Sequence, residues 1–351
     1  MPAKAKIGVL GASGYTGAEL VRLLLRHPDV DIALLTAERR AGKAMAEVFP
    51  QFAPYALPVL TALEDADWDA LALDLVFCAL PHGTTQQVIA GLLSRAAGTK
   101  VVDLSADFRL ADPQAYAHWY GHPHGAPQWQ KSAVYGLTEI YRDKVKAARL
   151  VANPGCYTTC AELALIPLLR AKAIAPDEIV IDAKSGMTGA GRGAREDMLF
   201  AEVAEGIHAY GVGHHRHMAE LDQELSLAAG RPVVASFTPH LIPMNRGILS
   251  TIYVRGPKAQ PQDLHAILLK CYANEPFVHV LPFGQLPQTR HVRGSNMTLI
   301  GLAADRIAGR AILGAALDNL TKGASGQAVQ NMNLMLGFPE ATALEQVALF
   351  P

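Results

Sequence analysis

The stretch that decides the fold is Lys6–Leu20, KIGVLGASGYTGAEL, close to the start of the chain. A strand-like apolar run comes first, and Gly11, Gly14 and Gly17 then lead into an amphipathic, helix-like run. Glycine at such a turn lets a pyrophosphate approach the exposed amides at the helix N-terminus. The same spacing also occurs where a helix only packs closely on a strand. Because the turn stands at the first strand–helix junction, we favour a dinucleotide-binding site.

The residues after the second strand-like run, DIALLTA at 31–37, indicate which dinucleotide binds. A carboxylate there bonds a ribose hydroxyl, whereas arginine pairs with a 2′-phosphate. Thr36 stands near the strand end, and Arg39 and Arg40 follow Glu38. We therefore predict NADP(H), while Glu38 keeps NAD as an alternative and both arginines also fit a solvated loop.

The first 152 residues alternate strand-like and helix-like runs. LDLVFCALP at 73–81 and KVVDLSADF at 100–108 read as strands, with a helical run between them, and RLVANPG at 149–155 reads as the last strand. Strands that alternate with crossover helices form parallel sheets. The sequence thus predicts an α/β protein with a Rossmann-type dinucleotide-binding domain over residues 1–152.

Beyond about Pro176 the chain becomes richer in long strand-like segments punctuated by Pro and Gly. These segments are residues 178–193, 231–256 and 295–317. Such segments indicate a mixed sheet, so we predict an α+β substrate and dimerisation domain over residues 153–318. A helical pattern at 316–336 ends this domain or packs back on the first, within a C-terminal segment 319–351.

Composition limits the class of function. Half of the 351 residues are hydrophobic and the formal net charge is −1. A chain of this size buries a large core, and a near-neutral charge sets aside no basic surface for nucleic acid or an anionic membrane. We expect a small-molecule partner. The start of the chain does not resemble a secretory signal and no window is apolar enough for a membrane span, so we expect a cytoplasmic protein without a disulfide scaffold.

The stretch NPGCYTTCAEL at 153–163 carries two of the four cysteines. Cys156 follows a Pro-Gly turn and opens an apparent helix, where the aligned backbone dipoles favour the nucleophilic thiolate. Cys160 lies one helical turn further on, and we interpret it as a small buried hydrophobe. Two cysteines alone are too few ligands for structural zinc, and the position of Cys156 favours a nucleophile, while a disulfide with Cys160 stays open.

A second group of titratable residues lies in HAYGVGHHRHMAEL at 208–221. Either one histidine is the proton donor and acceptor for Cys156, oriented by Glu220, or the histidines bind a metal. The spacing differs from HExxH, in which histidines four apart bracket a glutamate, so we favour the acid–base role and expect no metal. The group consists of His208, His214, His215, His217 and Glu220.

A nucleophilic thiol combined with a nicotinamide site narrows the chemistry. Thiol attack on an activated acyl group gives a thioester, which hydride reduces to an aldehyde once the leaving group has departed. An acyl phosphate is the natural donor.

Nine motifs, in order and spacing, resemble one family over nearly the whole chain. They are GASGYTGAEL, ALPHGTT, VDLSADFRL, YGLTEIYR, NPGCYTT, SGMTGAGR, HHRHMAEL, FTPHLIPMNRGILSTIYV and NLTKGASGQAVQNMNLMLGFPE. The family is the N-acetyl-gamma-glutamyl-phosphate reductases of arginine biosynthesis, in their longer form, which are related to aspartate-semialdehyde dehydrogenase. The resemblance implies an NADP-binding Rossmann domain, a substrate domain inserted before a C-terminal helix that returns to the first domain, and a homodimer or homotetramer.

The resemblance also implies roles for single residues. Cys156 matches the catalytic cysteine and His217 the acid–base histidine, although the choice between His215 and His217 stays open. The expected substrate-binding residues are Arg109, Arg192, His215, Glu220, Tyr210 and Ser185. A guanidinium holds a carboxylate or phosphate bidentately, but each arginine also fits a structural ion pair. The expected cofactor-binding residues are Gly11, Ser13, Gly14, Tyr15, Thr16, Gly17, Thr36, Arg39, Arg40, Pro81, Ser105 and Gly186.

The resemblance therefore predicts an NADP-dependent oxidoreductase that converts N-acetyl-L-glutamyl 5-phosphate to N-acetyl-L-glutamate 5-semialdehyde through a Cys156 thioester. Two alternatives stay open. A related reductase that acts on carrier-protein-bound aminoadipyl or glutamyl phosphate needs a basic surface for its acidic carrier. A non-catalytic NADP-binding redox sensor joins Cys156 and Cys160 in a regulatory disulfide.

Overall fold

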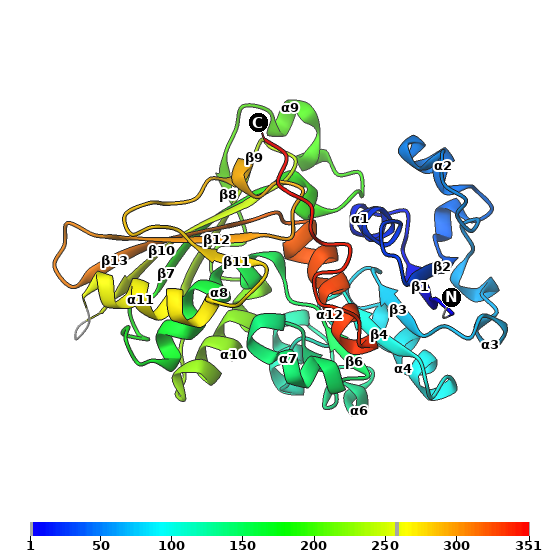
Figure 1. Cartoon of the computed structure of the whole chain (residues 1–351), viewed down its shortest axis with the longest axis horizontal. Coiled ribbons are helices and arrows are strands. Elements are labelled where there is room, and N and C mark those ends of the chain that lie inside the picture. The colour runs from blue at the N-terminus through cyan, green and yellow to red at the C-terminus, as the bar shows by residue number, and fades with distance from the viewer. Residues whose placement is uncertain (1–2, 257–259, 351) are drawn as a thin grey trace. The chain divides into compact units, whose positions relative to one another are not determined.

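The computed structural model describes residues 3–256 and 260–350. The chain divides into two compact units. The first unit comprises the residues up to Pro154 together with Ala324–Glu345, and the second comprises Gly155–Gly323 and the residues from Gln346 onward. Each unit has its own sheet and its own helices (Figure 1).

The first unit is built on a six-stranded sheet, counted over the described residues, in which every pair of neighbours is parallel. The strand order is β2-β1-β3-β4-β6-β5, so the chain changes direction across the sheet at β1. Ligands of open parallel sheets bind at such a switch point, beyond the carboxyl ends of the strands. The strands are β1 (Ala5–Leu10), β2 (Val30–Leu35), β3 (Leu75–Cys78), β4 (Lys100–Asp103), β5 (Val134–Tyr135) and β6 (Leu150–Ala152).

Helices bury this sheet on both faces, so its inner strands are continuous apolar runs. Strand β3 reads LVFC and all four residues are buried. Helix α1 starts directly after Gly14 and buries its apolar stripe, Leu20, Leu23 and Leu24. The helices of this unit are α1 (Tyr15–Leu24), α2 (Met45–Val48), α3 (Trp68–Leu71), α4 (Thr85–Arg95), α5 (Pro113–Tyr120), α6 (Pro127–Gln130), α7 (Thr138–Ala147) and α12 (Gly326–Leu336).

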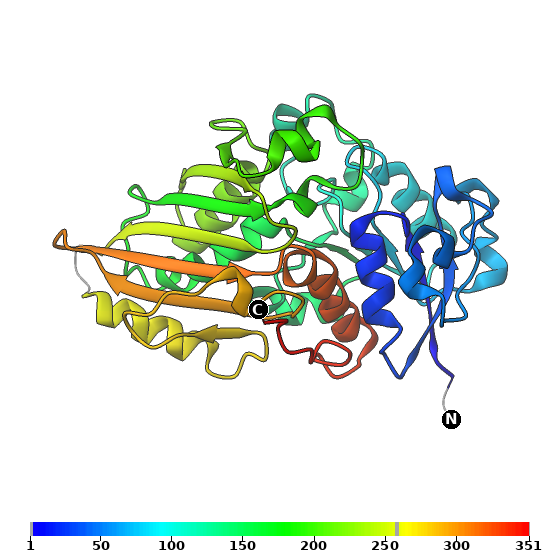
Figure 2. The same ribbon diagram turned by 90° about the horizontal axis from the view of Figure 1, so that it is seen from above.

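Helix α12 comes from the far end of the sequence, yet it lies in the first unit beside α1 and α7 (Figures 1 and 2). All of its residues up to Met335 are buried, including the side chains of two glutamines and two asparagines. The Nδ2 of Asn331 donates to the Gly136 carbonyl at 2.9 Å and to Oδ1 of Asn153 at 3.2 Å, and its Oδ1 accepts from Thr138 Oγ1 at 2.8 Å. A buried amide requires hydrogen-bond partners, and Asn331 keeps all three of these bonds only if the helix stays in this position.

The second unit has a seven-stranded mixed sheet within the described residues, in the order β11-β12-β13-β10-β7-β9-β8. Strand β7 is parallel to β9 and antiparallel to β10. Every second residue of β10 from Ile248 to Val254 is buried, which is the pattern of a sheet covered on one face. The strands are β7 (Val180–Gly186), β8 (His208–Ala209), β9 (Ser236–Ile242), β10 (Ile248–Arg255), β11 (Val278–Val280), β12 (Thr298–Ala304) and β13 (Arg310–Leu317).

Three long helices lie on one face of this sheet, and Figure 2 shows the other face with the helices behind it. Helix α8 is the central one, because it contacts β7, β10 and β13 of the sheet and also α10 and α11. Thirteen of its fifteen residues are buried, and most of these are apolar, as is typical of a helix in the middle of a core. The helices of this unit are α8 (Cys156–Arg170), α9 (Phe200–Val203), α10 (His217–Ala229) and α11 (Pro261–Tyr272). None of the helices in residues 3–256 and 260–350 is long and apolar enough to span a bilayer.

The predicted helix over 316–336 is corrected by the structure. Ala316 and Leu317 are the end of strand β13, where they pair with β12. The carboxylate of Asp318 then accepts the N–H groups of Leu320 and Thr321, which turns the chain away from the sheet. A π-helical turn, η7 (Thr321–Ser325), follows, and α12 starts only at Gly326.

The C-terminal segment also divides differently from the expected residues 319–351. The turn up to Gly323 stays in the second unit, and only Ala324–Glu345 lies in the first. The chain then returns to the second unit, where the N–H of Leu349 bonds the Arg293 carbonyl at 2.8 Å.

We predict that Asn331→Ala destabilises the first unit by about 2–4 kcal/mol, because Gly136, Asn153 and Thr138 each lose a buried partner. All three tryptophans, Trp68, Trp119 and Trp129, lie in the first unit. Urea unfolding followed by tryptophan fluorescence therefore measures this unit selectively.

The matched control is Met332→Leu, a volume-conserving change at the next buried position of α12, which we expect to cost less than about 1.5 kcal/mol. Equal midpoints for Asn331→Ala and Met332→Leu would contradict the role given to the amide.

Candidate active site

Cys156 is the first residue of helix α8, as the Pro-Gly turn predicts, and its side chain is partly exposed. Gly155 is the N-cap, in an extended conformation with φ −68° and ψ 155°. The thiol therefore stands at the end of a fifteen-residue helix where the N–H groups lack intrahelical partners. Such a position stabilises a thiolate.

Cys160 has a different environment one turn further along α8. Its side chain is fully buried and its Sγ donates to the Ala315 carbonyl at 3.3 Å. Burial raises the pKa of the Cys160 thiol to about 12, so it stays protonated at neutral pH. All four cysteines, Cys78, Cys156, Cys160 and Cys271, are free thiols.

Glu220 holds the start of α8 against the start of α10. Its side chain is 1% exposed, and its Oε2 accepts the Gly155 N–H at 3.0 Å and the Thr158 hydroxyl at 3.1 Å. The Oε1 of Glu220 lies 3.9 Å from Nε2 of His217, the first residue of α10. One carboxylate thus orients both the nucleophile's helix and the histidine.

His217 lies directly on Gly155, the residue before Cys156. A Cβ added to Gly155 would stand 2.5 Å from the His217 Nε2, so only glycine leaves room for the imidazole. From the sequence, Gly155 is expected only as part of a turn. Its place directly before the nucleophile is the signal that could have predicted a close neighbour, because a glycine permits close approach of another group.

His215 lies beside His217 but has another chemical state. Its Nδ1 accepts the backbone N–H of His217 at 3.1 Å, so the proton of the neutral ring is on Nε2. Burial lowers the pKa of His215 to about 4. His215 is therefore neutral at physiological pH and serves as a hydrogen-bond partner at the start of α10.

The expected Tyr210 belongs to a ring cluster with His215, His217 and Tyr157, with ring centroids 4.8–5.9 Å apart in the contacting pairs. Its hydroxyl lies 3.2 Å from that of Tyr157, to which it donates, and Tyr157 donates to the His240 carbonyl at 3.0 Å. Burial raises the pKa of both tyrosines, that of Tyr210 to about 12, so both stay protonated donors. Tyr157, not expected from the sequence, links Tyr210 to α8.

The other expected residues of this unit are Ser185, Gly186 and Arg192. Ser185 is buried at the end of β7 and its hydroxyl donates to the Gly186 carbonyl at 3.0 Å. The Gly186 N–H bonds the Gly247 carbonyl at 2.9 Å, and its expected role in cofactor binding stays a prediction. Arg192 is exposed in the loop after the short 3₁₀ helix η4 (Met187–Ala190).

The structure places the glycine turn at the switch point of the parallel sheet, between β1 and α1. Gly11 has φ +81°, and a Cβ there would collide with the Ala79 carbonyl. Gly17 lies against the Gly11 carbonyl and Ala12, so a side chain at Gly17 would push α1 off the turn. Ser13, Gly14, Tyr15 and Thr16 lie between them, in the turn and the first helical residues.

Thr36 supports this turn from the end of β2. It is buried, its hydroxyl accepts the Gly11 N–H at 3.2 Å, and its carbonyl accepts the Ala12 N–H at 2.8 Å. Arg39 and Arg40 follow in η1 (Glu38–Arg40) and are exposed. The Glu38 carboxylate accepts the Leu63 N–H at 3.0 Å, which anchors this loop.

The remaining expected residues of the first unit lie after β3 and β4. Pro81 is exposed. Ser105 is buried, and its hydroxyl donates to Asp103 at 2.7 Å, where burial raises the pKa of the Asp103 carboxyl to about 7. Arg109 is 6% exposed and donates to the Asn153 carbonyl at 2.8 Å and the Leu104 carbonyl at 3.1 Å. These bonds give Arg109 a structural use, while its binding of the substrate stays a prediction.

Within the described residues, no group of three or more His, Cys, Asp or Glu side chains is arranged to hold a metal ion. The three histidines at 214–217 contact other protein groups. The His214 ring lies within hydrogen-bond distance of the Val212 carbonyl, the His215 ring accepts the His217 N–H, and the His217 ring lies near the Glu220 carboxylate.

Comparisons with known proteins agree with both units. The family model described as "Semialdehyde dehydrogenase, NAD binding domain" matches residues 6–148, and "Semialdehyde dehydrogenase, dimerisation domain" matches residues 156–319. A structure of aspartate semialdehyde dehydrogenase II from Vibrio cholerae has a TM-score of 0.71 over 95% of this chain and 99% of that one. At 18% identity this likeness shows a shared fold, and it confirms the predicted α/β class.

Two curated relatives extend over the whole chain. The N-acetyl-gamma-glutamyl-phosphate reductase of Afipia carboxidovorans is 71% identical over 350 residues, which cover 99% of each chain. The relative of the same name from Rhodospirillum rubrum is 60% identical and covers 100% of each chain. The resemblance read from the nine motifs is confirmed: the chain belongs to the N-acetyl-gamma-glutamyl-phosphate reductase family.

Proposed function

We propose that the protein reduces N-acetyl-L-glutamyl 5-phosphate to N-acetyl-L-glutamate 5-semialdehyde, with release of phosphate, through a thioester on Cys156. The observation that supports this most directly is the partly exposed Cys156 at the start of α8, with His217 held beside it on Gly155. The names of the close relatives supply the substrate.

The first half of the reaction transfers the acyl group to the enzyme. The Cys156 thiolate attacks the acyl carbon, a C–S bond forms, the bond to the phosphate oxygen breaks, and phosphate leaves and takes up one proton. The Gly155 N–H is already bonded to Glu220, so the oxyanion of the tetrahedral intermediate is assigned to the backbone amides that follow it in the first turn of α8.

The second half reduces the thioester. A nicotinamide dinucleotide, for which the turn from Gly11 to Gly17 is the expected binding site, would supply the hydride that reduces the acyl carbon. His217 protonates the resulting oxyanion, and when the hemithioacetal collapses His217 takes the proton back, the C–S bond breaks and the thiolate is regenerated. Glu220 orients His217 for both proton transfers.

We assign NADPH rather than NADH as the reductant. Glu38 is the group that would bond a ribose hydroxyl, but its carboxylate accepts the Leu63 N–H within the protein. Arg39 and Arg40 are exposed beside it and suit a 2′-phosphate. We further infer a homodimer or homotetramer, since residues 156–319 match a dimerisation domain.

The proposed function is tested by assaying phosphate-dependent reduction of NADP⁺ with N-acetyl-L-glutamate 5-semialdehyde, the reverse reaction with a stable substrate. We predict that Cys156→Ser lowers kcat at least about a thousandfold while NADPH still binds, because a hydroxyl supplies no comparable nucleophile. Cys160→Ser is the matched control and stays within a few-fold of wild type, since Cys160 is buried and protonated. Comparable losses in both variants would instead support the disulfide sensor.

The two histidines are separated by comparing kcat and KM. His215 is neutral at physiological pH because burial lowers its pKa to about 4. We predict that His217→Asn lowers kcat roughly a hundredfold, because the proton donor is lost. His215→Asn acts mainly on KM, because a side chain that stays neutral supplies no proton in exchange with the substrate. A loss of kcat in His215→Asn as large as that in His217→Asn would contradict this assignment.

The cofactor assignment predicts that the double variant Arg39→Ala/Arg40→Ala raises the KM for NADPH roughly tenfold or more and leaves the KM for NADH nearly unchanged, because only NADPH loses charge-assisted bonds. The control is Arg95→Ala, an exposed arginine at the C-terminal end of α4. An unchanged preference in the double variant would exclude these arginines from the cofactor site.

A further inference from the structure

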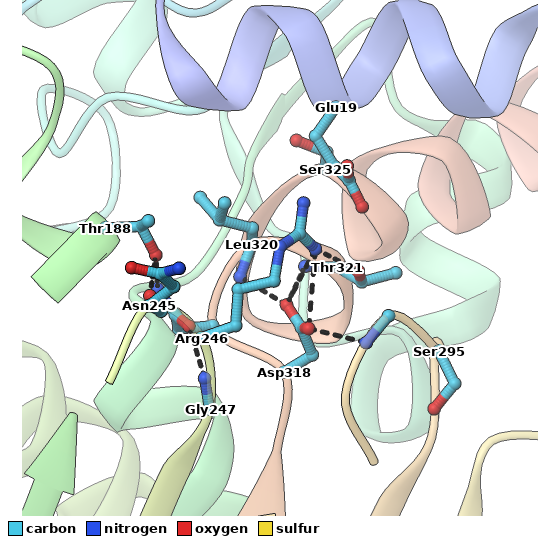
Figure 3. A network of polar contacts seen from close by, with 12 residues as sticks. Glu19, Thr188, Asn245, Arg246, Gly247, Ser295, Asp318, Leu320, Thr321 and Ser325 are labelled. Carbon is cyan, nitrogen blue, oxygen red and sulfur yellow. Dashed lines mark hydrogen bonds and ion pairs between the residues drawn. The ribbon is translucent and has the colours of Figure 1, made fainter. Parts of the chain in front are cut away.

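Asp318 is a fully buried carboxylate outside the chemistry assigned so far. It follows the last residue of β13, and Figure 3 shows it at the centre of a network of polar contacts. Its Oδ1 accepts the N–H groups of Leu320 and Thr321 at 2.9 Å each, and its Oδ2 accepts the Gly294 N–H at 2.7 Å. Nη1 of Arg246 lies 3.3 and 3.4 Å from the two oxygens. A buried carboxylate needs such partners, and here they come from three separate segments.

Asp318 also closes the π-helical turn with its backbone. The N–H of Gly323 bonds the Asp318 carbonyl, five residues back, at 2.9 Å. This is the pairing that defines a π-helix, a feature often found at functional sites. Side chain and carbonyl together therefore determine the path of the turn from Asp318 to Gly323.

This turn ends against the nucleophile. A Cβ added to Gly323 would stand 2.8 Å from the Cβ of Cys156, so the Gly323 backbone occupies the space on one side of the cysteine side chain. A backbone packed closely enough to exclude a Cβ here leaves less room for the sulfur on that side, which restricts rotation of the thiol about its Cα–Cβ bond. The position of Gly323 thus sets the positions open to the sulfur.

Asn319 fastens the same turn to the ends of two strands. Its Oδ1 accepts the Gly247 N–H at 2.7 Å, just before β10, and its Nδ2 donates to Thr188 Oγ1 at 2.9 Å, just after β7. Thr188 in turn donates to the Asn245 carbonyl at 2.6 Å (Figure 3). The turn is therefore held from two sides and cannot shift without breaking these bonds.

We propose that Asp318 is a positioning residue for the Cys156 thiol: it holds Gly323 against the cysteine side chain and so directs the sulfur toward the acyl carbon. The inference rests on the proposed role of Cys156 as the nucleophile. A misplacement of about 1 Å costs up to roughly a hundredfold in rate, so a residue that acts only through Gly323 still has a large effect on turnover.

The test compares Asp318→Asn, Gly323→Ala and the double variant in a Cys271→Ser background, because Cys271 is an exposed thiol that would also react. Two quantities are measured: the rate constant for alkylation of Cys156 by iodoacetamide, followed by mass spectrometry of the peptide, and kcat and KM in the phosphate-dependent assay. We expect each single variant to lower the alkylation rate and kcat together, by roughly tenfold or more, with a smaller change in the KM for NADP⁺.

The double variant shows whether Asp318 acts through Gly323. If it does, the double variant is no worse than the more damaged single variant, whereas independent effects multiply. Multiplied effects would overturn the proposal.

A general loss of stability is excluded by Leu268→Ala, which removes a fully buried side chain of α11 away from the turn and costs about 2–5 kcal/mol. It lowers the melting temperature but leaves the alkylation rate of Cys156 at the wild-type value. If Asp318→Asn does the same, the proposal is wrong.

If Asp318→Asn does not fold, the proposal is tested by Gly323→Ala alone. Wild-type alkylation and kcat in that variant would refute the positioning role. If instead Cys156→Ser retains turnover, the proposed function fails, while the alkylation rates still measure whether the turn controls the thiol.

Discussion

The interaction on which the catalytic unit depends is the buried carboxylate of Glu220. It lies near the first turns of two helices at once, in its own helix α10 and against the N-cap amide of α8. A negative charge is favourable at both helix N-termini, so one side chain stabilises the approach of the two helices. The approach is close enough that Gly155 carries no side chain where the His217 ring lies. Glu220 therefore positions both the start of the nucleophile's helix and the neighbouring imidazole, and both Cys156 and His217 belong to helices rather than to loops.

Both units have glycine at a helix start, but the group that lies against the glycine differs between them. In the first unit the glycines allow close backbone contacts between the turn and the start of α1, whose N-cap, Gly14, has no side-chain cap hydrogen bond. In the second unit the space above Gly155 is filled by the protein's own imidazole. The same property, the absence of a Cβ, thus allows close backbone packing at one helix start and contact with an imidazole at the other.

The parts predictable from the sequence are those whose determinants are local. The glycine turn, the parallel sheet around it and the helix that starts at Cys156 each follow from a short run of residues, and the structure has them at the expected positions. The motifs also identified the family, because their order carries information that no single motif has. What could not be predicted depends on contacts across the chain: Gly323 against Cys156, or Gly294 and Arg246 on Asp318. The run after β13 reads as one helix because nothing local reveals that Asp318 is bonded from elsewhere. The roles of Arg109, Arg192 and Gly186 rest on the resemblance and stay predictions.

The place of α12 in the first unit has a consequence for how the protein is made. A ribosome releases β1 to β6 long before it releases the helix that packs beside α1 and α7, because residues 155–323 are synthesised in between. At about 5–20 residues per second this interval is roughly ten to thirty seconds. During that time the nascent first unit lacks the helix whose amides bond Gly136, Asn153 and Thr138. The second unit, by contrast, has nearly all of its elements in one continuous stretch and can acquire its native contacts while it emerges. The first unit can therefore be completed only after the whole stretch of the second unit from Gly155 to Gly323 has been synthesised.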